Sequence, residues 1–375
     1  MLGRSERPPL LASLTGVVFD GIVVTLLMIE TRQHKLAEVL QLLPQYRQSQ
    51  VWEGLFMPTI EDWDSLSTLP KELRATLKQS LPWVSLTERH VLQSKRGDTY
   101  KALLETADHK MIETVLMQNS RGFWSICVSS QVGCAMACTF CATGKMGFTR
   151  NLTVDEIIDQ YRFWMYYLAL RPKLEQRISN LVYMGMGEPL ANYDNVKTSL
   201  QLLLQYTDMG PTRLTVSTVG LIPMLRKLLS DETWPPVRLA VSLHSADGET
   251  RRNIMPSSYP NFLEDLATWT KDYFMRFASR RRHLTFEYVM LSGVNDTAMH
   301  AEKLIQFARK VGKVKINLIP YNDTKSKYGT SESKALLAFE KKLLDARVDV
   351  TRRRTMGADI AAACGQLIVE KKQEK

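Results

Sequence analysis

Six short β-rich runs alternate with helical stretches over most of the chain, and this alternation restricts the fold more than any other feature. The runs are FWSICVS from Phe123, ISNLVYMGM from Ile178, RLTVSTV from Arg213, VRLAVSL from Val237, HLTFEYVML from His283 and KVKINLI from Lys313. Strands separated by helices pair in parallel through right-handed crossovers. Six such units predict an α/β fold, a barrel or partial (βα)6 barrel of the TIM type. In such barrels the chemistry lies at the carboxyl ends of the strands.

The segment before these runs has a different pattern. From Arg32 to about Lys95, the stretches HKLAEVLQLL, SQVWEGLF and LPKELRATLKQSL carry apolar residues at helical spacing, and prolines separate them. We therefore predict three parts: an unassigned extension over residues 1–30, a small helical accessory domain over 31–95, and a barrel domain over 96–375. Within the barrel, Thr153 and Glu156 have the spacing of a capping box at the start of a helix.

The first 30 residues contain an apolar stretch that Asp20 divides, and neither half reaches the roughly 20 residues of a membrane span. We expect a buried or additional segment there and no membrane partner. The chain has only five cysteines in 375 residues, too few for a fold built on disulfides. This cysteine usage predicts a reducing, cytoplasmic setting.

The net charge of +10 is concentrated in a few places, which include SRRRH at Ser279–His283 and TRRRT at Thr351–Thr355. Clustered arginines are compatible with a nucleic-acid partner and equally with a solvated surface. Charge alone therefore leaves both possibilities open.

The most specific signal is the trio Cys134, Cys138 and Cys141, spaced C-x3-C-x2-C with Phe140 before the last cysteine. Structural zinc sites take four ligands, and no fourth cysteine or histidine lies nearby. Thiolates also hold iron–sulfur clusters, and three of them on a 4Fe–4S cluster leave one iron open.

Other polar residues follow the expected strands at the same edge of the sheet. Gly187 and Glu188 follow the second run within GMGEP, which lacks the spacing of a phosphate-binding loop. The remaining candidates at strand ends are Ser217, Thr218, Ser242, His244 and Asn322. Each would be ordinary alone, so it is their shared position that predicts a site.

The cysteine pattern resembles the radical S-adenosylmethionine (SAM) superfamily. The motifs SSQVGC, FCATGKMGF, RNLTVDEI, MGMGEPLAN, VSTVG, SLHSADGETR, FEYVMLSGVND, NLIPYN and GADIAAACGQL extend the likeness to the radical SAM RNA adenine methyltransferases, the RlmN/Cfr family. The resemblance runs from about Tyr46 to Leu367 and leaves residues 1–30 unmatched. It implies a partial barrel, RNA methylation and a 4Fe–4S cluster on Cys134, Cys138 and Cys141.

The resemblance also implies the SAM contacts. The matching positions are Gly187, Glu188, Ser217, Ser242, Leu243, His244 and Asn322. A carboxylate such as Glu188 can receive the amino group of the methionine end.

Three further residues acquire roles only through the resemblance. Cys364 matches the cysteine that is methylated and carries the methyl group, Cys127 matches its disulfide partner, and Glu113 matches the proton acceptor. Taken alone, the two cysteines would be inert packing residues and Glu113 an exposed strand carboxylate. The implied reaction uses two SAM molecules per turnover, because carbons 2 and 8 of adenine are too electron-poor to attack a methyl sulfonium directly.

Two reactions share all of these residues, methylation at carbon 2 (RlmN-like) and at carbon 8 (Cfr-like). Pro189 in GEPLAN favours carbon 2. We expect 23S rRNA and the tRNA adenosine at position 37 as substrates, a flavodoxin or ferredoxin as electron donor, and a monomer. A hypothesis from another class is a nucleic-acid-binding module stabilised by zinc.

Overall fold

The computed structural model describes residues 18–19, 22–23, 32–277 and 284–367. Two short strands, β1 (Val18–Phe19) and β2 (Ile22–Val23), pair with each other. The predicted 1–30 extension otherwise lies outside the described residues, as does the SRRRH cluster.

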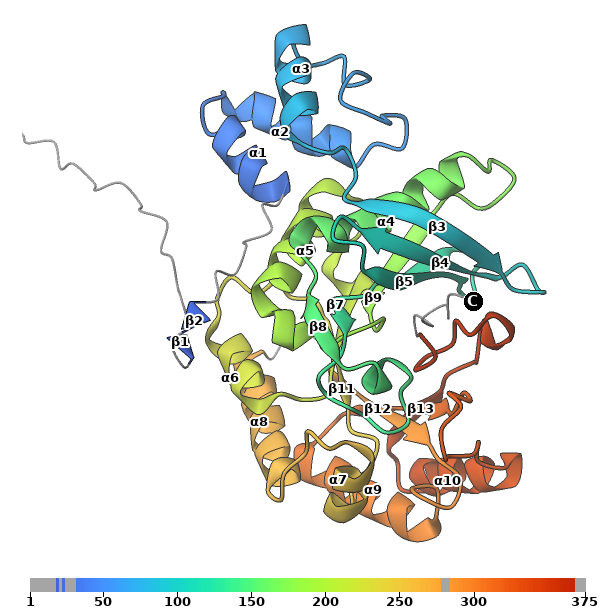
Figure 1. Ribbon diagram of the computed structural model, residues 1–375. Helices are drawn as coiled ribbons and strands as arrows, with labels where there is room; N and C mark the ends of the chain where they lie inside the picture. Colours follow the sequence, from blue (N-terminus) through green and yellow to red (C-terminus); the bar gives the residue numbers. More distant parts are fainter. Residues whose placement is uncertain (1–17, 20–21, 24–31, 278–283, 368–375) are drawn as a thin grey trace, which may run out of the picture.

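A single sheet of ten strands forms the centre of the described structure, in the order β14-β13-β12-β11-β10-β9-β6-β5-β4-β3 (Figure 1). Its parallel part consists of β6 (Trp124–Cys127), β9 (Ile178–Tyr183), β10 (Leu214–Thr218), β11 (Arg238–Ser242), β12 (Leu284–Met290), β13 (Lys315–Pro320) and β14 (Asp349–Arg352). Every one of the six expected runs forms one of these strands, and β14 is an addition. The predicted α/β partial barrel is confirmed.

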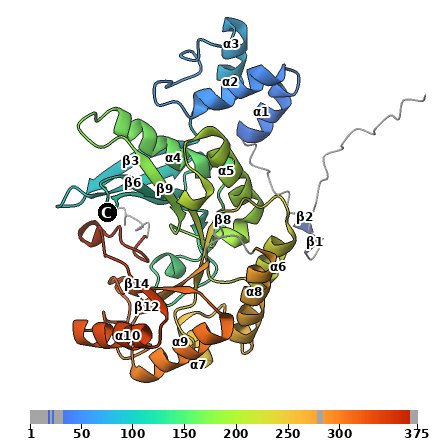
Figure 2. The same cartoon turned by 180° about the vertical axis from the view of Figure 1, so that it is seen from behind.

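Helices connect the parallel strands and cover the outer face of the sheet (Figures 1 and 2). They are α4 (Val154–Ala169), α5 (Tyr193–Tyr206), α6 (Ile222–Ser230), α7 (Gly248–Ile254), α8 (Phe262–Arg276), α9 (Ala298–Val311) and α10 (Ser333–Asp345). Their apolar faces bury large side chains such as Trp164 and Trp269, and the Trp269 indole donates to the Leu225 carbonyl. Burial of each such side chain contributes about 2–3 kcal/mol to stability.

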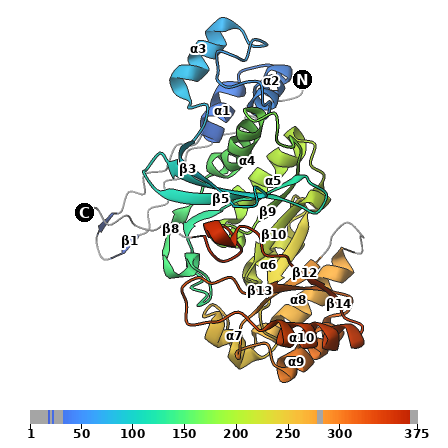
Figure 3. The same cartoon turned by 90° about the vertical axis from the view of Figure 1, so that its right-hand side faces the viewer.

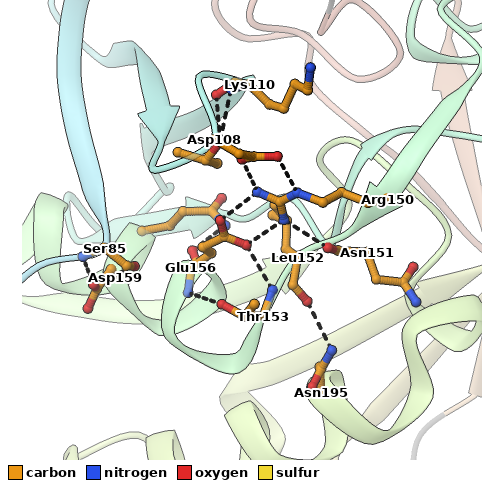
Figure 4. Close-up of polar contacts among 12 residues, drawn as sticks. Ser85, Asp108, Lys110, Arg150, Asn151, Leu152, Thr153, Glu156, Asp159 and Asn195 are labelled. Atoms are coloured by element: carbon orange, nitrogen blue, oxygen red, sulfur yellow. Dashed lines mark hydrogen bonds and ion pairs between the residues drawn. The ribbon is translucent and has the colours of Figure 1, made fainter. Parts of the chain in front are cut away.

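Helix α4 begins with the predicted capping box, in which the Thr153 side chain accepts from the Glu156 backbone and the Glu156 side chain accepts from Thr153. Arg150 adds a second contact, donating to Glu156 at 2.8 Å and to Asp108 at 2.6 Å (Figure 4). Arg150 lies on β8 (Phe148–Asn151), which pairs with β7 (Gln131–Gly133). The two strands flank the cysteine loop, so this ion-pair network ties the base of that loop to the rest of the protein.

An antiparallel extension of the sheet differs from the expected pattern. The predicted helical segment contains α1 (Arg32–Leu40), α2 (Gln45–Leu55) and α3 (Lys71–Ser80), but it ends before β3 (Leu86–Gln93) rather than at Lys95. Strand β3 is followed by β4 (Thr99–Thr106) and β5 (Met111–Gln118), and the three form an antiparallel meander beside β6. Leu86 is the one fully buried residue of β3, so the strand shows no apolar alternation that sequence analysis could detect.

The three helices α1–α3, which we call the helical cap, are joined to the barrel by buried charges. Arg32 contacts Asp159 at 2.8 Å, and Arg162 contacts the same carboxylate at 2.5 Å. Asp159 also accepts from the backbone of Ser85, at the start of the meander. A buried pair of this kind holds the cap firmly, because loss of one partner leaves an uncompensated charge. No helix of the described residues is both long and apolar enough for a membrane span.

The carboxyl-terminal segment, residues 357–367, returns across the open side of the barrel (Figure 3). It contains a short 3-10 helix, Ala358–Ile360. The carbonyls of Gly365 and Leu367 accept from Ala142 and Thr143 of the cysteine loop, at 2.8 and 2.6 Å. At its other end, the Ala361 carbonyl accepts from Lys101 of β4. The segment thus connects the meander to the cysteine loop and closes one side of a cavity.

Candidate active site

A cavity with a volume of about 140 Å³ opens at the carboxyl ends of the parallel strands, where the barrel type predicts the site. The cysteine loop forms one wall, and the carboxyl-terminal segment with Cys364 forms another. Residues after β9, β10 and β11 complete it. The cavity therefore unites segments from the two ends of the barrel domain.

The cysteine loop is held in an irregular conformation by its backbone contacts. Cys134 donates to the Gly147 carbonyl at 2.8 Å, and Thr139 donates to the Ile254 carbonyl at 3.0 Å. Gly144 packs so closely that a Cβ there would lie 2.8 Å from the Cys138 carbonyl oxygen, which only glycine avoids. The loop directs all three cysteines to the same cavity.

These three thiols suit a shared cationic group. Burial raises the pKa of Cys134 to about 11 and also raises those of Cys138 and Cys141, and the neighbouring thiolates add to the increase at Cys138. The raised pKa values mean that ionising these buried thiols costs free energy. Iron would offset this cost, because it binds the thiolates. Among the described residues, no three His, Cys, Asp or Glu side chains converge on a point as a single metal ion requires. A 4Fe–4S cluster instead takes each cysteine on a different iron.

Gly187 and Glu188 lie on the cavity wall directly after β9. Gly187 has a φ of +100°, and a Cβ would meet the Gln131 side chain at 2.5 Å, so glycine is required at this turn. The buried Glu188 carboxylate accepts from Val219 and Leu190 at 2.8 and 3.0 Å. Burial raises its pKa to about 7 even though these hydrogen bonds, and one from Thr218, oppose the increase. An ammonium group is the natural partner for such a carboxylate.

His244 follows β11 and lines the same cavity. Its Nδ1 accepts from the Val289 backbone at 3.0 Å, and its ring meets the edge of Phe140 at a centroid distance of 4.9 Å. Burial lowers the pKa of His244 to about 3, and Arg251 lowers it further, so the ring is neutral. A neutral imidazole can bind a ligand by hydrogen bonding without adding charge.

The other expected SAM contacts divide into two groups. Ser217 and Ser242 line the cavity, at the ends of β10 and β11. The Leu243 side chain is fully buried, and its backbone donates to the Glu287 carbonyl at 3.0 Å. Asn322 donates to the carbonyl of Cys364 at 3.2 Å and does not line the cavity. In this structure Asn322 therefore holds the carboxyl-terminal segment.

Cys127 and Cys364 approach each other from opposite ends of the barrel domain. Cys127 ends β6 and is buried, whereas Cys364 is exposed and lines the cavity. Burial raises the pKa of Cys127 to about 12, and the nearby Cys364 thiol adds to this. The pKa of Cys364 is also raised, mainly because the surrounding protein atoms shield its sulfur from water, although Arg353 opposes the increase. Both thiols are free, so either can react.

Glu113 is buried on β5, which rules out the exposed strand carboxylate considered above. Its Oε1 lies 2.8 Å from Lys101 Nζ, and Lys101 is diagonally opposite it on β4. The same ammonium donates to the Ala361 carbonyl at 3.2 Å, three residues before Cys364. The Glu113–Lys101 pair is thereby attached to the segment that carries Cys364.

Among the cavity residues that sequence analysis missed are two charged ones, Glu287 and Arg353. Glu287 is a single charge in the apolar strand FEYVML, which was the available signal. Arg353 belongs to the TRRRT cluster that we considered as a surface patch, yet its side chain lines the cavity. Its position directly after β14 could have indicated this, because strand carboxyl ends converge on the site.

Comparison with known proteins identifies the relatives of this chain. The Radical SAM superfamily model matches residues 128–308. The dual-specificity RNA methyltransferase RlmN of Oleidesulfovibrio alaskensis is 41% identical over 336 residues, which cover 86% of this chain and 89% of that protein. The RlmN enzyme of Desulfotalea psychrophila is 39% identical, covering 90% and 93%. The crystal structure of a radical SAM methyltransferase from Sphaerobacter thermophilus superimposes with a TM-score of 0.82 at 36% identity, covering 90% of this chain and 97% of that one.

Proposed function

Because this chain belongs to the RlmN family of radical SAM RNA methyltransferases, we propose that it methylates carbon 2 of adenosine through a methylated cysteine. The proposed substrates are an adenosine of 23S rRNA and the adenosine at position 37 of tRNAs. The observation that carries the proposal is the meeting of Cys127 and Cys364 beside the cavity of the three clustered cysteines. Membership of the family also sets aside the zinc-stabilised binding module.

The family uses a 4Fe–4S cluster and SAM, and the residues of the cavity fit both. Cys134, Cys138 and Cys141 would hold the cluster, and the buried Glu188 would receive the amino group of SAM. Ser217, Ser242, Leu243, His244 and Asn322 would contact the rest of the molecule, and Asn322 also binds the Cys364 backbone. With both bound, the site supplies a deoxyadenosyl radical that removes a hydrogen atom from a methyl group.

Cys364 is proposed to act first, as an ordinary nucleophile. Its thiol loses a proton, and the sulfur attacks the methyl carbon of one SAM molecule. The new bond joins this sulfur to carbon, and the bond from carbon to the sulfonium breaks with its electron pair, leaving S-adenosylhomocysteine. Exposure of Cys364 to the cavity allows this approach. The radical chemistry would need a second SAM molecule, which gives two per turnover.

Glu113 and Cys127 are proposed to complete the reaction. Once carbon is joined to the adenine ring and one electron has been returned, Glu113 removes the proton from the ring carbon, with Lys101 as its counter-charge. The Cys127 thiolate then attacks the Cys364 sulfur and forms a disulfide, while the carbon–sulfur bond breaks with its electron pair on the methylene carbon, which takes up a proton from water as the methylated base leaves. A reductant must supply two electrons to reopen the disulfide. A flavodoxin or ferredoxin is the proposed source of the electrons that form the radical.

Methylation of Cys364 would change the ionisation of Cys127. Burial and the neighbouring Cys364 thiol both raise the pKa of Cys127. Once Cys364 carries carbon it is a neutral thioether, so the second contribution disappears. The Cys127 thiolate therefore becomes easier to form when it is needed.

Carbon 2 is preferred to carbon 8 because Pro189 follows Glu188 in GEPLAN and because the relatives named above are RlmN enzymes. We also propose a cytoplasmic monomer, since the described cysteines are free, and an accessory role in RNA binding for the helical cap.

The product decides the proposal directly. The cluster-loaded enzyme is incubated with a 23S rRNA fragment or a tRNA transcript, SAM and reductant, and the RNA is digested to nucleosides. We expect 2-methyladenosine from both RNAs. Formation of 8-methyladenosine alone would establish the Cfr-like reaction instead, and a product from rRNA alone would remove tRNA from the substrates.

A further inference from the structure

An ion pair between a buried carboxylate and a half-buried arginine lies on the cavity wall beside the two reactive cysteines. Glu287 comes from β12 and is 3% exposed, and Arg353 follows β14. Glu287 Oε2 makes no hydrogen bond and lies 3.7 Å from Arg353 Nε, while Oε1 accepts from Asn317 at 3.0 Å. None of the roles assigned above uses either residue.

The guanidinium of Arg353 is held from several directions. Its backbone donates to the Leu318 carbonyl at 2.8 Å, which fixes the residue against β13. Both terminal nitrogens lie 3.3 Å from the Met184 sulfur, a weak acceptor that leaves most of their donor capacity free. Arg353 therefore presents a positive charge to the cavity with one carboxylate, Glu287, as its counter-ion.

The charges around Cys364 act in opposite directions. Arg353 favours the Cys364 thiolate, whereas Glu287 and Cys141 disfavour it, and Cys127 interacts with the same sulfur. The Lys101–Glu113 pair faces the same segment from the meander, through Ala361. Arg353 is the one of these groups that lines the cavity with Cys364 and carries a positive charge.

We propose that Arg353 is a positioning residue that stabilises the Cys364 thiolate during methyl transfer, and that Glu287 holds Arg353 and limits its effect. This inference rests on the proposed role of Cys364 as methyl acceptor. Transfer of the thiol proton leaves a negative charge on sulfur, which the guanidinium stabilises until the charge is cancelled by the sulfonium methyl group. Glu287 pairs with the arginine before the thiolate exists, so the buried carboxylate always has a counter-ion.

The two residues should have opposite effects on the reactivity of Cys364, which can be measured without turnover. The anaerobic, cluster-loaded protein is treated with iodoacetamide between pH 6 and 10, and alkylation of the Cys364 peptide is followed by mass spectrometry. Arg353→Met should slow alkylation at pH 8 by about tenfold and move the pH profile upward by about one unit, whereas Glu287→Gln should accelerate it several-fold. Arg353→Lys should restore part of the rate.

The control is Lys315→Met, which removes an exposed cation at the amino end of neighbouring β13 and should leave alkylation unchanged. A loosened cavity would expose Cys364 and accelerate alkylation in both cavity variants. The proposal would be overturned if Arg353→Met and Glu287→Gln changed the alkylation rate of Cys364 in the same direction, or if neither changed it. The protein mass after incubation with SAM tests the underlying role separately, because absence of a methyl group on wild-type Cys364 would refute the proposed function and leave the alkylation result standing.

Discussion

The two sulfur-bearing walls of the cavity carry the same chemical group in different settings. In the cysteine loop, Cys134, Cys138 and Cys141 lie within eight consecutive positions and are directed inward by one short backbone segment. The other wall carries Cys364, close to the end of the chain, and Cys127 at the end of the first parallel strand is buried near it. The first wall is a local structure, and the second exists only when the entire barrel has formed.

This difference assigns different chemistry to the two walls. Adjacent thiols on one loop repel each other as thiolates and suit a cationic cluster, whereas Cys127 and Cys364 lie near each other and share the guanidinium of Arg353 as their nearby cation. Arg353 and Glu287 adjust the charge at the second wall. In the proposed function, cluster binding and covalent catalysis therefore depend on different cysteines. A mutation can remove either one while the other is kept.

Replacing a cysteine of the cysteine loop should have the largest effect. Replacing Cys134, Cys138 or Cys141 by Ala should abolish the cluster and all SAM cleavage, because no remaining thiol lies on that loop to replace a ligand. Iron and sulfide analysis and 5'-deoxyadenosine release measure this. Cys127→Ala is the matched control and should retain full iron and SAM cleavage. A cluster-cysteine variant with normal iron content would remove that residue from the ligand set.

Replacing Glu113, the proposed general base, should have the next largest effect. Glu113→Gln should lower RNA methylation by about 10²–10⁴-fold, the usual range for a general base. Methylation of Cys364 precedes the proton transfer and should continue, as protein mass spectrometry can show. Glu105→Gln replaces another buried, ion-paired carboxylate, on adjacent β4, and should keep near-normal turnover. Equal losses in both variants would indicate a structural role for Glu113.

A smaller effect is expected on SAM affinity when pH changes the protonation of Glu188. Its pKa near 7, raised by burial, means that SAM must displace a proton below that pH if its ammonium binds the carboxylate. SAM affinity should therefore fall about tenfold per unit as pH decreases below 7, and remain level above it. In the absence of SAM, the effect of pH on folding stability through Glu188 has the opposite direction. Glu188 stabilises the folded protein below pH 4.5, and this stabilisation is lost as pH rises through 7.

Equilibrium dialysis of the cluster-loaded protein between pH 6 and 8 measures this affinity. Glu188→Gln should bind SAM weakly with no pH dependence in this range, whereas Glu249→Gln, on exposed α7, should behave as wild type. A Glu188→Gln variant with the wild-type profile would assign the titration to another group.

The smallest effect concerns RNA binding outside the cavity. The helical cap, residues 32–81, carries six Lys or Arg and six Asp or Glu, so its net charge is zero. Arg352 and Arg354 flank Arg353 at the cavity wall and are exposed. The double change Arg352→Gln/Arg354→Gln should reduce the slope of log affinity against log salt by about 1–2, and Lys71→Gln/Lys78→Gln on the cap should reduce it less. The reverse order would place the RNA on the cap.

The features predicted from sequence are those encoded by neighbouring residues. The six parallel strands, the Thr153–Glu156 capping box and the cysteine loop each depend on spacing within one segment. Strand β3 escaped prediction because one side of it faces solvent and its pairing with β4 supplies most of its order.

The features that could not be predicted depend on contacts between distant segments. Burial of Glu113 requires Lys101 across the sheet and the return of the carboxyl-terminal segment. Asn322, which we expect to contact SAM, also donates to the Cys364 backbone, a contact between distant segments. Arg353 lies in a run of three arginines that looks uniform, and only the direction of β14 distinguishes the middle one.

The central claim is that Cys364 carries the methyl group and Cys127 releases the product. The most direct test is a denaturing gel of Cys127→Ala after one turnover with labelled RNA, SAM and reductant. The account predicts a slowly migrating, RNase-sensitive species in which RNA remains attached to Cys364, and none in Cys364→Ala or in the double variant. Normal turnover by Cys127→Ala, or an adduct that forms without Cys364, would contradict it.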